Sequence, residues 1–232
     1  MRRSPASICS ATVAYNEVIA VQRSKFERGR PADAARHRSP EGAGSGAPPP
    51  GCTIYTIGHS NRSLEEFLGL CAGHRLEQIC DVRTIPKSRH NPQFGQPGFQ
   101  VSLEAAGLVY QGLHGLGGLR HAQADSINTG WRNLSFRGFA DYMQTPAFAA
   151  ALAALEALAH ERRTAIMCAE AVPWRCHRSL IADALEARHW TVLDIMTTAP
   201  ARPHRRTPFL SITDGVLSYP PERPAEEPPE KA

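Results

Sequence analysis

Short runs of apolar and β-branched residues recur along the chain, separated by longer segments in which apolar residues repeat with a helical period. Because turn-forming residues bound these short runs, they predict buried β-strands. Four strands are predicted at Thr53–Ile57, Gln78–Val82, Thr164–Cys168 and Thr191–Ile195, and a shorter one at Leu108–Tyr110.

Three of the intervening segments repeat apolar residues every three or four positions, which predicts amphipathic helices. They run over Ser63–Gly73, from Thr145 to about Glu161, and over Ser179–Arg188. The first begins with a capping box, since Glu66 follows Ser63 by three residues. Residues 83–99 are rich in Pro, Gly, Asn and Arg, and we expect a loop there.

Strands that alternate with helices predict an α/β fold. We expect a single three-layer domain at residues 53–219, with a mostly parallel sheet of about five strands and helices on both faces. The segments outside it are rich in Gly, Pro and charged residues, which cannot bury enough apolar surface to fold. Residues 1–52 and 220–232 are therefore predicted to be disordered tails.

The charge balance gives no broad case for nucleic-acid binding. The chain of 232 residues has a net charge of +4, and the excess lies in residues 1–52, with eight Lys and Arg against four Asp and Glu. Residues 53–198 carry thirteen of each sign. A neutral domain lacks a general attraction for polyanions, although a local basic patch can still bind them.

Cysteine usage favours a reducing compartment. The six cysteines do not form the dense pattern of a disulfide-rich secreted domain, and Cys71 and Cys80 lie within apolar runs. The chain also lacks a run of about 18 apolar residues, so no membrane span is expected. We therefore expect a cytoplasmic protein with free thiols.

Polar clusters follow three of the predicted strands directly. In open parallel sheets, ligands bind outside the carboxyl ends of the strands, so these clusters should converge on one crevice. They are Gly58-His59-Ser60, Asp81 with Arg83, and Cys168 with Glu170.

The segment from Cys168 to Arg178 combines thiols, a histidine and arginines before a predicted helix. Amides at a helix start and nearby arginines favour an anion, and the same field lowers a thiol pKa. The Cys-x5-Arg spacing of thiol phosphatases is absent, because six residues separate Cys168 from Arg175. The alternative is that Cys168 and Cys176 only pack, and that Glu170 and Arg178 form an internal salt bridge.

The stretch from Asp81 to Arg89 carries one carboxylate and three cations, Arg83, Lys87 and Arg89. It predicts an anion clamp in which Asp81 orients an arginine or acts as a base; a solvated basic loop is the alternative. His59 can act as a general acid or base near neutral pH, or it can simply cap the strand end.

No cofactor is required by these motifs. Zinc is possible through Cys168, Cys176 and His177 with His59, but no Cys-x-x-Cys pair supports it, and we assign no metal. A phosphate-binding P-loop and a Gly-x-Ser-x-Gly elbow are also absent from the sequence.

Five ordered motifs resemble the bacterial and archaeal family called domain of unknown function 488. They are TIGHSNRSLEEF, DVRTIPKSRHNPQF, LGGLR, RGFADYM and MCAEAVPWRCHRSLIADAL. The resemblance covers about residues 53–219 and implies a cytoplasmic α/β domain, but no reaction. It implies that signature positions fall at His59, Asp81, Arg83, Ser88, Arg89, Cys168, Glu170, Cys176, His177 and Arg178. Relatives often end the last strand with His-Ile, whereas this chain has Asp194-Ile195.

The leading hypothesis is an enzyme, a hydrolase or transferase, that acts on a phosphorylated or nucleotide-like anion. Its expected catalytic residues are His59, Asp81, Cys168, Glu170 and His177. Its expected substrate-binding residues are Ser60, Arg83, Ser88, Arg89, Cys176 and Arg178. The expected partner is a small anionic ligand or nucleotide, with nucleic acid possible and no membrane.

Two other hypotheses remain open. One is a non-catalytic nucleotide or nucleic-acid binding module that uses the same arginines, with Trp131, Trp174 and Phe94 as stacking surfaces. The other is a scaffold whose polar cluster only stabilises the fold.

Overall fold

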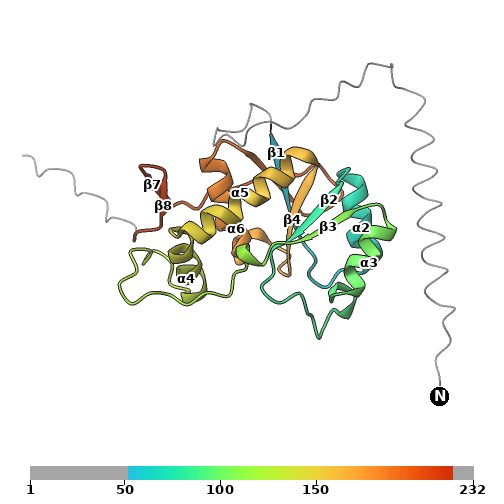
Figure 1. The fold of residues 1–232 in the computed structure, drawn as a ribbon, viewed down its shortest axis with the longest axis horizontal. Helices are drawn as coiled ribbons and strands as arrows, with labels where there is room; N and C mark the ends of the chain where they lie inside the picture. The colour runs from blue at the N-terminus through green and yellow to red at the C-terminus, as the bar shows by residue number, and fades with distance from the viewer. Residues whose placement is uncertain (1–51, 222–232) are drawn as a thin grey trace, which may run out of the picture.

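A computed structural model describes residues 52–221 of the chain (Figure 1). The predicted disordered tails at 1–52 and 220–232 therefore lie outside the described residues, apart from Cys52, Pro220 and Pro221. Within the described part, no helix is both long and apolar enough to cross a membrane.

One mixed sheet forms the centre of the domain, with strand order β3-β2-β4-β1-β5-β6. Its strands are β1 (Thr53–Gly58), β2 (Gln78–Asp81), β3 (Val109–Gly112), β4 (Thr164–Cys168), β5 (Thr191–Ile195) and β6 (Arg202–Pro203). The first five are parallel and β6 is antiparallel to β5, so the predicted mostly parallel sheet is confirmed. A separate hairpin joins β7 (Ser211–Thr213) to β8 (Val216–Ser218).

The five α-helices of the described region are α2 (Leu64–Gly73), α3 (Gly98–Ala105), α4 (Leu134–Met143), α5 (Pro146–Glu161) and α6 (Arg178–Ala187). Three short 3-10 turns are η2 (Pro92–Phe94), η3 (His114–Leu116) and η4 (Pro173–Arg175). The predicted capping box is present, with the Ser63 hydroxyl accepting from the Glu66 amide at 3.1 Å.

Two helices were not predicted. The expected loop at 83–99 gives way to α3 at Gly98, and α4 is capped by Asn133, whose side chain accepts from the Ser135 amide at 2.8 Å. Phe, Tyr, Ser and Gly favour helices only weakly, so tertiary packing rather than local propensity decides α4.

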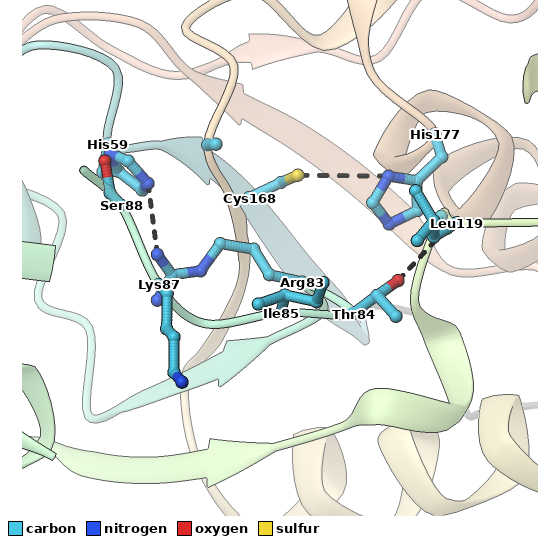
Figure 2. A pocket seen from close by; sticks show the side chains of 11 residues that line it. His59, Arg83, Thr84, Ile85, Lys87, Ser88, Leu119, Cys168 and His177 are labelled. Atoms are coloured by element: carbon cyan, nitrogen blue, oxygen red, sulfur yellow. Dashed lines mark hydrogen bonds between the residues drawn. The ribbon is translucent and has the colours of Figure 1, made fainter. Parts of the chain in front are cut away.

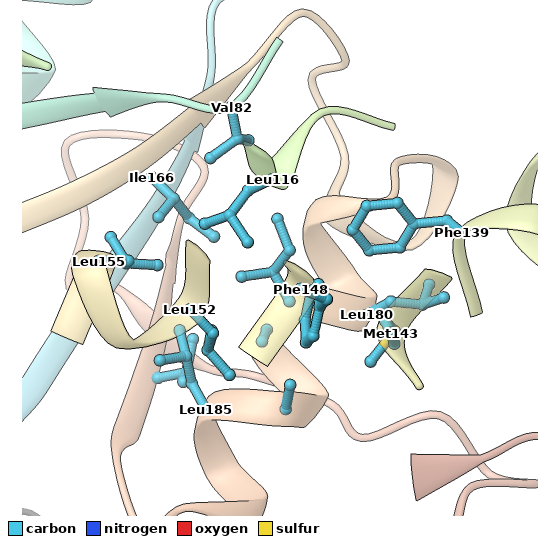
Figure 3. Packing of buried hydrophobic residues seen from close by; sticks show 14 of the residues in the cluster. Val82, Leu116, Phe139, Met143, Phe148, Leu152, Leu155, Ile166, Leu180 and Leu185 are labelled. Carbon is cyan, nitrogen blue, oxygen red and sulfur yellow. The ribbon is translucent and has the colours of Figure 1, made fainter. Parts of the chain in front are cut away.

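The sheet separates two apolar cores, which confirms helices on both faces. Side chains alternate along a strand, so Ile54 and Ile166 face one core and Tyr55 and Met167 face the other. Helices α4, α5 and α6 cover the first core (Figure 3), and α2 and α3 cover the second.

Strand β4 lies between β2 and β1, so the three strands with polar ends are neighbours. Gly58 is in register with Cys168, and Asp81 with Met167. The three predicted polar clusters therefore emerge at the same edge of the sheet, as the parallel arrangement requires.

Arg178 fixes the connection that follows β4. Its guanidinium is completely buried and donates to backbone oxygens of Ile57 at 3.1 Å, Glu170 at 2.9 Å and Ala171 at 3.1 Å. The connection crosses Gly58 closely, since a Cβ there would lie 1.8 Å from the Glu170 oxygen. The start of the β4–α6 connection is thereby held against the end of β1.

A buried polar cluster attaches the C-terminal segment to the sheet. His204 lies between Asp183 of α6, at 3.1 Å, and Asp194 of β5, at 3.6 Å. Thr56 donates to Asp194 at 2.6 Å, and Tyr219 donates to Asp183 at 3.0 Å. Burial opposes protonation of His204, but the two carboxylates prevail and raise its pKa to about 9.

Replacement of Gly58 by alanine should strongly destabilise the fold, because the added methyl group meets backbone that cannot move freely. We expect the free energy of unfolding to fall by about 3 kcal/mol. Gly69 is the matched control, since the methyl group of an alanine at this position of α2 would meet no group of the described residues within 4 Å. Gly69→Ala should raise stability by about 0.5–1 kcal/mol. Equal effects in urea unfolding would contradict the close crossing.

The His204 cluster should make stability depend on pH. Because the pKa of His204 is raised in the folded chain, its stabilising effect is complete below 6.5 and is lost as pH rises through about 9. We expect this to lower the free energy of unfolding by about 2–3 kcal/mol over that range. His204→Gln should remove that part of the pH dependence. The free energies of unfolding of the native chain and the variant, plotted against pH, should therefore converge above pH 9. A constant difference at every pH would refute the assignment.

Candidate functional site

A pocket of about 310 Å³ opens at the carboxyl ends of β1, β2 and β4 (Figure 2). Its lining comes from the ends of these strands, the loop after β2, the segment after η3 and the start of α6. The residues are His59, Arg83, Thr84, Ile85, Lys87, Ser88, Gly118, Leu119, Cys168, Ala169 and His177.

Cys168, Cys176 and His177 form a compact thiol–imidazole group. The His177 Nδ1 atom lies 3.9 Å from the Cys168 sulfur and 3.6 Å from the Cys176 sulfur (Figure 2 draws the first contact). The other nitrogen, Nε2, lies 3.1 Å from the Val82 carbonyl, so it carries a proton and donates. In a neutral imidazole, Nδ1 is then left as an acceptor that faces both sulfurs.

The two thiols of this group have opposite pKa shifts. A hydrogen bond from Cys176 lowers the pKa of Cys168 well below its usual value, despite burial, and His177 and Arg178 act in the same direction. The same hydrogen bond, with burial, raises the pKa of Cys176. By contrast, burial alone dominates at Cys71 and Cys80 and raises each pKa to about 12. Cys168 is therefore the more acidic of the two thiols, and Cys176 is the thiol that donates to it.

Asp81 orients Arg83, which is one of the two roles expected for it. The carboxylate is fully buried and accepts from Nε of Arg83 at 2.9 Å and Nη2 at 2.6 Å. It also accepts from the Tyr110 hydroxyl at 3.0 Å. The remaining Nη2 proton goes to the Phe94 carbonyl at 2.9 Å. Since a guanidinium has five N–H donors, Nη1 keeps protons for His59 and for a ligand.

His59 forms the wall opposite the thiols. Its Nδ1 lies 2.9 Å from the Ser60 carbonyl, and its Nε2 lies 3.3 Å from Nη1 of Arg83. Burial, above all, lowers its pKa, and the charge on Arg83 adds to this effect. The neutral ring thus donates through Nδ1 and accepts from Arg83 through Nε2, so both nitrogens are engaged.

The expectation that Phe94 offers a stacking surface to a ligand is wrong. The phenyl ring is completely buried and stacks on His59 instead, with ring centres 4.3 Å apart.

Several other expected residues lie outside the pocket. Glu170 and Arg89 are exposed and do not line it. Ser60 does not line it either, and its amide donates to the Ala169 carbonyl at 2.8 Å. Arg178 lies behind the pocket, where it binds carbonyl oxygens rather than the Glu170 carboxylate. Ser88 does line the pocket, and its hydroxyl accepts from the Asn91 amide at 2.9 Å.

Sequence reasoning missed the wall formed by Gly118 and Leu119. A Cβ on Gly118 would lie 2.4 Å from Nδ1 of His177, so only glycine lets the imidazole approach this segment. The Leu119 amide donates to the Thr84 hydroxyl at 3.1 Å, which joins the two loops. The paired glycines of the LGGLR motif were the available signal.

The thiol–imidazole group also offers three donor atoms to a metal ion. The sulfurs of Cys168 and Cys176 and Nδ1 of His177 all lie within 4.8 Å of one another. Structural zinc sites use four protein ligands, and His59, the fourth ligand considered from sequence, uses both its nitrogens in other contacts. Among the described residues, no other group of three such side chains has this spacing.

The comparisons with known proteins agree with the resemblance seen in the sequence. No curated protein and no solved structure matches the chain. The family described as domain of unknown function DUF488 matches residues 63–185, which is more than half of the chain. The matched region contains Asp81, Arg83, Cys168, Cys176 and His177, and the chain therefore belongs to the DUF488 family.

Proposed function

We propose that the chain is an enzyme that uses Cys168 as a nucleophile on a phosphorylated or nucleotide-like anionic substrate. The observation that carries this proposal is the contact of the Cys168 sulfur with His177 and Cys176 at the wall of the pocket. A thiolate is a strong nucleophile, and an adjacent imidazole is the usual base that forms it.

The cations around the pocket support an anionic substrate. Arg83 keeps an Nη1 proton directed away from Asp81, and its guanidinium is held in place by that carboxylate. Lys87 also lines the pocket and has no ion pair among the described residues. A fixed donor such as Arg83 stabilises negative charge with little reorganisation.

These groups suggest a simple reaction sequence. His177 takes the Cys168 proton on Nδ1, and the thiolate attacks phosphorus while the bond to the leaving oxygen breaks. The leaving oxygen then takes the proton from His177, and water hydrolyses the cysteinyl-phosphate. Cys176 remains a thiol that donates to the Cys168 sulfur. This chemistry needs a reduced Cys168, which fits the cytoplasmic location that cysteine usage favours.

Alkylation by iodoacetamide tests the nucleophile directly. With a chelator present, Cys168 should react about tenfold faster at pH 7 than an ordinary thiol, because a free cysteine is mostly protonated there. Half-buried Cys52 serves as the internal reference. Mass spectrometry of the digested protein measures both rates, and a Cys168 no faster than Cys52 would refute the proposal.

The role of Cys176 can be tested by the same measurement. Cys176→Ala removes the hydrogen bond that lowers the pKa of Cys168, so alkylation of Cys168 at pH 7 should slow several-fold. Cys176→Ser keeps a donor and should restore most of the rate. Equal rates in the two variants would show that the hydrogen bond is irrelevant.

Phosphate should protect Cys168 from alkylation if the pocket binds anions. Lys87→Ala should raise the phosphate concentration needed for protection about tenfold, which corresponds to the loss of one charge-assisted contact. Arg89→Ala is the matched control, because Arg89 is an exposed cation outside the pocket lining. Equal losses in both variants would indicate general charge attraction instead. If Cys168 is alkylated rapidly but neither phosphate nor phosphomonoesters protect it, the proposal of an anionic substrate is wrong.

A further inference from the structure

A second and larger cavity, of about 600 Å³, lies beyond the carboxyl end of β5. It is formed by η4, the start of α6 and residues 202–209, and it shares no lining residue with the Cys168 pocket. The β4–α6 connection separates the two, since His177 lines the first and Trp174 lines the second. We call this second cavity the β5 cavity.

Three aromatic rings line the β5 cavity, those of Trp131, Trp174 and Phe209. Trp174 is 65% exposed, an unusual state for so large an apolar side chain. Trp131 packs on Phe209, with ring centres 5.0 Å apart. The indole Nε1 of Trp131 is buried and has no hydrogen-bond acceptor among residues 52–221. A buried N–H without a partner costs about 1–3 kcal/mol, so an acceptor on a bound molecule would be favourable there.

Arginines also line the β5 cavity, and their charge is not fully balanced. Arg202 and Arg205 are exposed and have no ion pair among residues 52–221. Arg206 lies 3.4 Å from Glu186. Asp194, the carboxylate within the cavity lining, already faces His204. The cavity therefore combines excess positive charge with exposed aromatic surface.

We propose that the β5 cavity binds a mononucleotide. The base would stack on Trp174 and accept a hydrogen bond from Nε1 of Trp131, while Arg202 and Arg205 hold the phosphate. Its volume falls within the range of about 300–1,000 Å³ that is typical of small-molecule sites. Stacking of bases on tryptophan and bidentate binding of phosphate by arginine are both common.

This inference does not rest on the reaction proposed for Cys168, because the two sites have different walls. Cys168→Ser removes the nucleophile and leaves the β5 cavity intact, whereas Trp174→Ala does the reverse. Failure of one proposal is therefore distinguishable from failure of the other.

Calorimetric titration of the full chain with the four ribonucleoside monophosphates tests the proposal, with adenosine and inorganic phosphate as separate probes. At least one monophosphate should bind, and more tightly than either probe. Trp174→Ala should abolish the binding that distinguishes the monophosphate from inorganic phosphate, while phosphate binding in the Cys168 pocket persists. Arg205→Ala should weaken monophosphate binding in the β5 cavity about tenfold. Trp131→Phe keeps the aromatic packing but loses the N–H, so it should weaken binding several-fold.

Two control variants should leave binding unchanged. Arg162→Ala removes an exposed arginine that precedes β4, at the opposite edge of the sheet, and Cys168→Ser alters only the other pocket. Circular dichroism checks that each variant is folded. Four results would overturn the proposal: no binding, equal binding of phosphate alone, unchanged binding by Trp174→Ala, or much tighter binding of a single-stranded oligonucleotide.

Discussion

The buried guanidinium of Arg178 has no carboxylate partner among the described residues, and its hydrogen bonds hold the strand ends around the Cys168 pocket in place. Removing a charged group from water is costly unless hydrogen bonds and opposite charge compensate. Arg178 is completely buried, and no ion pair within the described region neutralises it. Its Nη1 and Nη2 groups donate to three carbonyls, one at the end of β1 and two in the connection after β4. These contacts fix the entry to α6 and so the position of His177.

The lowered pKa of Cys168 is linked to the same buried charge. The hydrogen bond from Cys176 lowers that pKa most, and the charge on Arg178 adds to the effect. By reciprocity, a thiolate on Cys168 would stabilise the buried guanidinium. Arg83, the other buried arginine, is balanced differently, by the carboxylate of Asp81. The two buried guanidinium groups thus differ in their surroundings. A carboxylate pairs with Arg83, whereas backbone carbonyls and the acidic thiol of Cys168 lie around Arg178.

Much of the fold could be predicted from local pattern. Capping signals at Ser63 and Thr145 and the short β-branched runs located most strands and helices, because these features depend on neighbouring residues. The parallel sheet then predicted that the three polar strand ends would meet. Helix α4 escaped prediction, since its apolar face matters only once it packs on the sheet.

The partners of the charged residues could not be predicted in this way. The sequence identifies Arg83, Arg89 and Arg178 equally as cations, but only tertiary structure distinguishes a clamped, an exposed and a buried guanidinium. The β5 cavity was equally hidden, because Trp131, Trp174 and Arg205 come from three distant segments. Such contacts depend on chain topology rather than on spacing along the sequence.

The contacts of Arg178 have an evolutionary consequence. All its acceptors are main-chain oxygens, and these persist whatever side chains the connection after β4 carries. Substitutions at Glu170 and Ala171 can therefore alter the surface beside both cavities without removing the hydrogen bonds of Arg178 to their carbonyl oxygens. Gly58 is the exception, because the crossing leaves no room for any side chain. Variation of the surface beside the two cavities should thus be concentrated in this connection, while the scaffold stays unchanged.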